Sequence, residues 1–323
     1  MAFKTKREKK KIFLKVISYL STSIDRFVLL ISVLMLLITG YSMWDNAQVY
    51  KLASAEEFSQ YKPVNEKELS FGELKKINSD VIGWIEVYGT EIDYPIVQTT
   101  DNSQYLNTTV DGKFSTAGSI FLDFRNNPNF TDFSNIIYGH HMAERKMFGD
   151  LDKFVEKEFF DTHKYAVIKR DGLSDLGIEL FAIIKTHGTD EIIFNNKIND
   201  PKSKNSLIDY LYQNSIYNRD VNLTLEDNIV LLDTCTFTIT NGRYILAGKL
   251  TDKAVKNPFP PEKSENKFID FTKNIPKKPV LFLILLLLLM IAILYRLYVA
   301  YSEKEKREKL DMEAFDENEN NEN

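Results

Sequence analysis

The stretch LLDTCTFTITNGRYILAGKL, residues 231–250, indicates the fold class and holds Cys235, the one cysteine of the chain. Both ends of the stretch are rich in β-branched and aromatic residues, which are typical of strands. The turn-forming pair Asn-Gly at 241–242 lies between them. The stretch therefore predicts two neighbouring antiparallel strands, with Cys235 at the end of the first and Arg243 at the start of the second.

The register of this strand pair is open from the sequence. If residues 236–242 form the connecting loop, Cys235 and Arg243 face each other across a hairpin. An Asn-Gly pair, however, is a strong signal for a tight two-residue turn. A turn of that kind at 241–242 would pair Thr240 with Arg243 and carry Cys235 away from the arginine.

Segments of the same composition precede this pair, with turn residues between them. Together they make about eight strands, which predict a closed β-barrel or a β-sandwich. Helices are expected before the first strand and in two inserts, at 147–161 and 206–218. The eight expected strands are VIGWIEV (81–87), IDYPIVQ (92–98), GSIFLDF (118–124), NIIYG (135–139), YAVIKR (165–170), IELFAIIKTHG (178–188), NIVLLDTCTF (228–237) and RYILAGKL (243–250).

Two uncharged apolar runs flank the strand-rich region, and each is close to the ~20 residues that cross a bilayer as a helix. The basic N-terminus favours a cytoplasmic start, so both termini are expected inside the cell and the middle of the chain outside. A cleaved signal peptide ending near Ala53-Ser54-Ala55 is the competing interpretation of the first run. The expected organisation is a basic cytoplasmic segment (1–26), a transmembrane helix (27–44), a helical region (45–80), a catalytic β-barrel (81–252), a linker (253–278), a second transmembrane helix (279–299) and a charged cytoplasmic tail (300–323).

The composition excludes some functions and draws attention to the thiol. A net charge of −5 provides no large basic surface, so nucleic acid is not an expected partner. Exported proteins usually pair their cysteines or lack them, yet Cys235 has no possible partner within the chain. It is therefore a buried small hydrophobic residue, a reactive thiol, or a cysteine that forms a disulfide with a second copy of the chain.

A nucleophilic thiolate needs a neighbouring base, and the chain has four histidines. His140 and His141 directly follow an expected strand, and His187 lies at the end of another. His163 follows an expected helix among charged residues and is predicted to be exposed. Across the hairpin, Arg243 is suited to donate hydrogen bonds to the oxyanion of a tetrahedral intermediate, although a surface ion pair is the simpler alternative.

The set YGHHM (138–142), LLDTCTFT (231–238) and GRY (242–244) resembles the sortase family, and GSIFLDFRNNPNF (118–130) resembles it too. Sortases are membrane-anchored cysteine transpeptidases of Gram-positive bacteria. The resemblance implies a mainly β fold, an eight-stranded sortase-like barrel with N-terminal helices and helical inserts. It assigns Cys235 as nucleophile, His140 as acid/base and Arg243 as the stabiliser of the oxyanion or substrate. It covers roughly residues 70–252.

Class B is the most similar subtype, because it has helices before the barrel and a long helix between its sixth and seventh strands. Asp233 departs from the family motif, which commonly has Ser or a small apolar residue there. On a strand, this carboxylate shares a face with Cys235 and is placed to hold Arg243. The C-terminal membrane span also departs from class B, since it is more familiar in pilin-polymerising sortases.

The resemblance implies cleavage of a C-terminal sorting motif in exported surface proteins or pilin subunits, followed by transfer of the acyl group to an amine. That amine is either a pilin lysine, which pilus assembly would use, or a peptidoglycan precursor, which cell-wall anchoring would use. The chemistry demands no metal or organic cofactor. Two alternatives from other classes are a papain-like cysteine protease and a non-catalytic membrane scaffold in which Cys235 is buried.

Overall fold

The computed structural model describes residues 6–55, 59–62, 69–195, 198–236, 240–259, 283–303 and 306. The chain divides into two units. One unit comprises residues 47–264 and holds the β-structure, and the other comprises residues 1–46 and 265–323.

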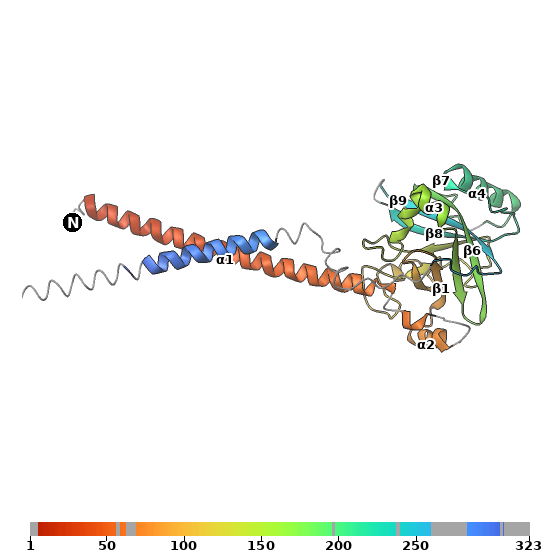
Figure 1. The fold of residues 1–323 in the computed structure, drawn as a ribbon, viewed down its shortest axis with the longest axis horizontal. Coiled ribbons are helices and arrows are strands. Elements are labelled where there is room, and N and C mark those ends of the chain that lie inside the picture. Colours follow the sequence, from red (N-terminus) through yellow and green to blue (C-terminus); the bar gives the residue numbers. More distant parts are fainter. Residues whose placement is uncertain are drawn as a thin grey trace, which may run out of the picture. The chain divides into compact units, whose positions relative to one another are not determined.

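The β-structure is a closed barrel of eight strands, which confirms the fold class predicted from the sequence (Figure 1). Neighbouring strands follow the order β5-β1-β2-β3-β4-β8-β9-β6, and a pairing between β5 and β6 closes the ring. A ninth strand, β7 (Ser215–Asn218), pairs with β6 outside the ring. The barrel strands are β1 (Val81–Val87), β2 (Asp93–Val97), β3 (Ile120–Leu122), β4 (Ser134–Tyr138), β5 (Tyr165–Arg170), β6 (Leu173–His187), β8 (Ile229–Thr236) and β9 (Gly242–Thr251).

The directions of three neighbouring strands determine which strand ends lie at the same rim of the barrel. β4 and β8 are parallel neighbours, so their C-terminal ends reach the same rim of the barrel. β8 and β9 are antiparallel, so β9 begins at that rim. The residues after β4, at the end of β8 and at the start of β9 therefore gather at one rim.

β8 is buried on both faces, which explains its continuous apolar sequence. Leu232 belongs to a cluster that draws side chains from all eight barrel strands and fills the interior. Its neighbour Leu231 points the other way, into an outer cluster with Leu207 and Leu211 of α4. Each such side chain, fully removed from water, contributes about 1.5–3 kcal/mol of hydrophobic stabilisation.

The helices follow recognisable local signals. α4 (Pro201–Gln213) begins after Asp200, whose carboxylate accepts hydrogen bonds from the backbone N–H groups of Lys202 and Ser203. The predicted insert at 206–218 is wrong in its last residues, because 215–218 pair with β6 as β7. The predicted insert at 147–161 is two short helices. The other helices of this unit are α2 (Leu69–Ile77), η2 (Ser59–Tyr61), η3 (Gln104–Leu106), η4 (Gly149–Val155) and α3 (Lys157–Thr162).

Two helices in the described residues are long and apolar enough to cross a membrane. One lies within α1 (Lys6–Leu52), where the candidate span runs over Lys15–Leu52, and the other runs over Leu283–Glu303. Residues 279–282, the start of the second predicted span, lie outside the described residues.

Candidate active site

Cys235 is next to last in β8 and is half-buried. β8 and β9 pair with Cys235 directly opposite Arg243 and Thr236 opposite Gly242. Directly opposite residues in an antiparallel pair project from the same face, so the thiol and the guanidinium share the outer face of the barrel. The tight-turn alternative, which would have paired Thr240 with Arg243, is wrong.

His140 follows the end of β4, beside the end of β8. Tyr138 pairs in parallel with Asp233, and the backbone N–H of Gly139 donates to the carbonyl of Asp233 at 3.0 Å. His140 is thus two residues beyond Tyr138, as Cys235 is two beyond Asp233. Gly139 must lack a side chain, since a Cβ there would lie 2.5 Å from Ile120 and about as close to Phe148.

The imidazole of His140 is held by a backbone group. Its Nε2 lies 2.8 Å from the carbonyl oxygen of Leu106, at the end of η3. A carbonyl only accepts hydrogen bonds, so Nε2 carries a proton in this contact. Among the described residues, no hydrogen bond joins His140 to Cys235.

Two other histidines, His141 and His187, also lie at this rim. His141 directly follows His140, and its Nε2 is 3.0 Å from a carboxylate oxygen of Asp152 in η4. His187 pairs with Gly242 on β9 and is exposed. Because His187 is one position beyond the pair of Thr186 with Arg243, it projects from the face opposite to Arg243.

His163 is not the exposed residue that the sequence suggested. Its ring stacks between Phe159, at 3.6 Å between ring centroids, and Phe259, at 4.5 Å. Burial between these rings lowers the pKa of His163 and disfavours its charged form. The role of His163 is therefore packing against these aromatic rings.

Asp233 lies two positions before Cys235 on β8 and shares the outer face with the thiol and the guanidinium. Its side chain is 0% exposed, and one oxygen is 3.4 Å from Nη1 of Arg243. The other carboxylate oxygen has no hydrogen-bond partner among the described residues, and neither has Nε of Arg243. Burial raises the pKa of Asp233 to about 7, and the nearby Arg243 offsets only part of that effect.

The raised pKa of Asp233 predicts how the stability of the folded protein depends on pH. Between the ordinary carboxyl pKa and about 7, the folded state keeps a proton that the unfolded state has released, so stability falls as the pH rises through that window. A shift of this size corresponds to a loss on the order of 4 kcal/mol. Asp233→Asn has no such proton to lose, and we expect it to unfold at a higher temperature than the wild type at pH 8, with a smaller difference at pH 4.5.

The measurement is thermal unfolding of the full chain in detergent between pH 4.5 and 8.5. Asp209→Asn is the matched control, because Asp209 is exposed on α4 and should leave the pH dependence as in the wild type. Equal pH dependence in Asp233→Asn and the wild type would show that Asp233 is ionised throughout this range.

Gly188 also belongs to the surroundings of Arg243, and the sequence did not single it out. A Cβ at this position would lie 2.9 Å from the amide oxygen of Asn241 and 3.1 Å from Nε of Arg243. The backbone N–H of Gly188 donates to the carbonyl of Asn241 at 2.9 Å. This contact ties the loop after β6 to the start of β9, and so supports the position of the guanidinium.

Comparisons with known proteins agree with this arrangement. No protein-family model matches the chain. Sortase B of Listeria monocytogenes is 36% identical over 183 residues, which cover 56% of this chain and 74% of that protein. A class B sortase of Streptococcus pyogenes involved in pilus biogenesis has a solved structure with 40% identity and a TM-score of 0.53, covering 58% of this chain and all of that one. A substrate complex of Staphylococcus aureus sortase B matches with 28% identity and a TM-score of 0.56, covering 65% of this chain and 98% of that one. With this identity, this coverage and the closed barrel, the chain belongs to the sortase family, among the class B sortases.

Proposed function

We propose that the protein is a membrane-anchored cysteine transpeptidase whose nucleophile is Cys235, whose acid/base is His140 and whose oxyanion donor is Arg243. The observation that carries the proposal is the pairing of Cys235 with Arg243 at the rim where β4 delivers His140. Family membership supports the reaction class, and the placement of these three residues supports their roles. The half-exposed thiol argues against a scaffold with a buried cysteine.

The first half of the reaction forms an acyl-enzyme. The Cys235 thiolate adds to the carbonyl of a threonine in the sorting motif, and Arg243 donates to the developing oxyanion. When the intermediate collapses, the peptide C–N bond breaks and the leaving amine takes a proton from the His140 imidazolium. The product is a thioester on Cys235 and a neutral His140.

The second half transfers the acyl group to an amine. The amine adds to the thioester carbonyl, the C–S bond breaks, and Cys235 leaves as a thiolate while His140 takes a proton from the nitrogen. The hydrogen bond from Nε2 of His140 to Leu106 supports this assignment, because it orients the ring and leaves Nδ1 to exchange the proton.

A papain-like protease is the less suitable alternative for the same residue types. In such an enzyme the nucleophilic cysteine opens a helix, whereas Cys235 lies at the end of β8. The barrel and the sortase relatives favour transfer to an amine over simple peptide hydrolysis.

The membrane topology that we propose has both termini in the cytoplasm and the barrel outside the cell. Asp25 precedes the first apolar run and Arg296 follows the second, and their charged groups lie 3.7 Å apart within one unit. That contact favours two antiparallel membrane helices with the two termini on the same side. The basic N-terminus favours the cytoplasmic side.

For the biological role, we propose pilus assembly, with a pilin lysine as the acceptor. The support is the C-terminal membrane span and the similarity to the S. pyogenes sortase, which is involved in pilus biogenesis. Anchoring of surface proteins to the cell wall, with a peptidoglycan precursor as the acceptor, is the second candidate, and it is favoured by the same class B similarity.

The test of the reaction class is capture of the acyl-enzyme. The full chain in detergent is mixed with fluorogenic peptides that hold threonine before the scissile bond, and the intact protein is weighed by mass spectrometry. We expect a mass increase equal to the acyl part of the peptide, located on Cys235. Cleavage without any such adduct would contradict the proposal.

Thiol alkylation tests the role of His140 separately. Because an imidazolium neighbour favours the thiolate, His140→Ala is expected to slow the reaction of Cys235 with iodoacetamide at neutral pH by about tenfold. His163→Ala is a matched control, since His163 packs between Phe159 and Phe259 and has no contact with Cys235 among those found in the described residues. An unchanged alkylation rate in His140→Ala would contradict the assignment.

A further inference from the structure

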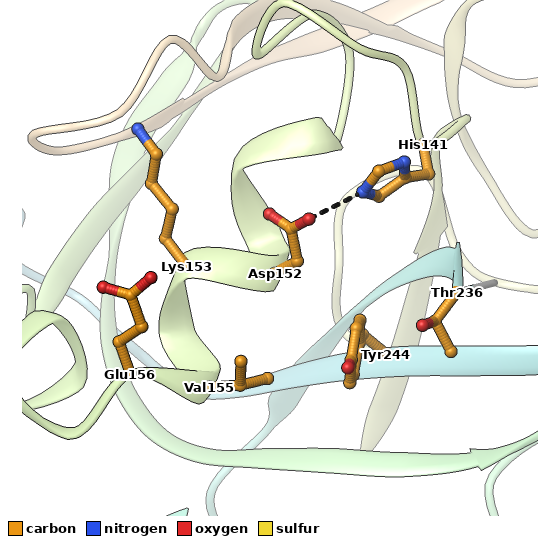
Figure 2. Close-up of a pocket in the computed structure, with 7 residues that line it drawn as sticks. All are labelled: His141, Asp152, Lys153, Val155, Glu156, Thr236 and Tyr244. Carbon is orange, nitrogen blue, oxygen red and sulfur yellow. Dashed lines mark hydrogen bonds and ion pairs between the residues drawn. The ribbon is translucent and has the colours of Figure 1, made fainter. Parts of the chain in front are cut away.

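A hollow of about 340 Å³ opens at the same rim, on the inner side of β8 and β9 (Figure 2). η4 covers one side of it and the ends of the two strands form the other, as the close-up shows. The residues that line it are His141, Asp152, Lys153, Val155, Glu156, Thr236 and Tyr244.

Three of these residues directly follow the three proposed catalytic residues in the sequence. His141 follows His140, Thr236 follows Cys235, and Tyr244 follows Arg243. Successive side chains on a strand point to opposite faces, so Thr236 and Tyr244 point away from the face that carries the thiol and the guanidinium. The hollow therefore lies on the inner face of β8 and β9 at the rim, and the thiol and the guanidinium lie on the outer face of the same two strands.

The charged groups of the hollow are mainly acidic. The carboxylate of Asp152 is 46% exposed and points toward His141, to which a dashed line joins it in Figure 2. Glu156 is exposed and lies at the other side of the hollow in Figure 2, and none of the ion pairs found among the described residues includes it.

Lys153 does not neutralise this charge. Its ammonium is 3.0 Å from the buried carboxylate of Asp150, and in Figure 2 it points away from Asp152. Asp150 is itself fixed by Arg145 at 3.0 Å and by the backbone N–H of Glu91 at 2.8 Å. The lysine therefore belongs to the network that holds η4 in place.

This combination suits a primary ammonium group on an aliphatic chain. Two carboxylates attract the charge, and the hydrophobic surfaces of Val155 and Tyr244 accommodate the methylene groups. The volume is sufficient for a lysine side chain or a short peptide terminus. An acyl donor on the outer face would leave this side open to a second substrate.

We propose that this hollow is the acceptor site, where Asp152 and Glu156 bind the ammonium group of the incoming amine, an inference that rests on the proposed transpeptidase function. The ammonium must lose one proton before it can attack, and His141, supported by Asp152, accepts it. The amine then adds to the thioester on Cys235 and the C–S bond breaks. The thiolate leaves, and the second proton passes from nitrogen to His140.

The test separates acylation from transfer. The full chain in detergent is acylated with Nα-acetylthreonine benzyl thioester, which avoids any dependence on the sorting motif. The rate at which the acyl-enzyme is hydrolysed and the rate at which it transfers its acyl group to an added amine are then measured separately. The two amine arms are Nα-acetyl-lysine methylamide, which presents a side-chain ammonium, and triglycine, which presents an N-terminal one.

We expect Asp152→Asn and Glu156→Gln each to raise the KM for the amine by about tenfold, and the double variant to raise it further. Acylation and hydrolysis should stay within twofold of the wild type. Transfer to hydroxylamine, which is uncharged at neutral pH, should also be unaffected. Glu158→Gln is the control, because Glu158 is exposed on α3 outside the hollow.

The outcomes distinguish the two levels of the proposal. No acylation of the wild type would overturn the proposed function itself. Normal acylation with an unchanged amine KM in the double variant would overturn the acceptor site alone, as would an equal loss with hydroxylamine. A larger effect in one amine arm identifies which kind of amine the hollow accepts.

Discussion

Replacing Cys235 by alanine is expected to abolish peptide cleavage and amine transfer, with a fall in kcat on the order of 10⁴- to 10⁶-fold. The reason is that the proposed reaction passes through a bond to this sulfur, and no other thiol in the chain can replace it. Binding of the sorting motif should persist, because the outer face and Arg243 remain. The measurement is fluorogenic peptide cleavage together with the mass of the protein after exposure to peptide.

The fold should survive this substitution. Cys235 forms no disulfide and is half-exposed, so the alanine leaves no large cavity. Thermal unfolding of the variant should stay close to that of the wild type. Cleavage at the wild-type rate by a folded Cys235→Ala variant would exclude Cys235 as the nucleophile and revive the scaffold alternative.

Much of the barrel could be predicted because most of its strands are apolar segments bounded by turn residues. Residues 165–170 carry one continuous strand signal, and the structure has β5 at those bounds. The extension of β6 to Leu173 had no such signal. Residues 173–177 read as a polar turn, and they become a strand only because β5 lies beside them. β7 was missed because four residues following a helix are too few to show an alternating pattern.

The register at the active rim shows why a local signal can mislead. Asn241 does adopt a positive φ of 50°, as an Asn-Gly pair predicts. The residue directly precedes β9, however, and its carbonyl accepts the N–H of Gly188. The long pairing of β6 with β9 fixes the position of β9, and this non-local contact is not visible in residues 231–250.

The sequence predicted which residues form the candidate site, but it did not predict how deeply they are buried or what surrounds them. Alternation along β8 places Asp233 on the face of Cys235, yet only the structure shows that this carboxylate is buried. The hollow behind the strand end could not be found at all from the sequence, because η4 forms one wall and lies about eighty residues from β8.

Arg243→Ala is expected to lower kcat for peptide cleavage by about 10²- to 10³-fold, the usual cost of removing one oxyanion donor. Arg243→Lys should recover only part of this loss, because a lysine keeps the charge but not the planar fork of donors. The expected signature is a fall in kcat with little change in KM, since the interaction forms in the transition state.

A second measurement distinguishes whether Arg243 stabilises the oxyanion or activates the thiolate of Cys235. The guanidinium is 29% exposed and opposite the thiol, and its other neighbour is the buried Asp233 at 3.4 Å. If Arg243 acts on the oxyanion, Arg243→Ala should leave alkylation of Cys235 by iodoacetamide within a few fold of the wild-type rate, because alkylation forms no oxyanion. A parallel fall in alkylation and peptide cleavage would instead show that the arginine activates the thiolate.

Asp233 supplies the control for this interpretation. Because Arg243→Ala leaves Asp233 buried without its cation, part of the loss in kcat comes from a carboxylate that disfavours negative charge at the site. Asp233→Asn combined with Arg243→Ala removes that contribution. Loss of the cation raises the pKa of Asp233 further, so we expect the double variant to recover up to about tenfold of the lost rate only at alkaline pH, where Asp233 is ionised in Arg243→Ala, and little of it at pH 6. Recovery of the full rate would mean that Arg243 serves only to neutralise Asp233, and would contradict its role as an oxyanion donor.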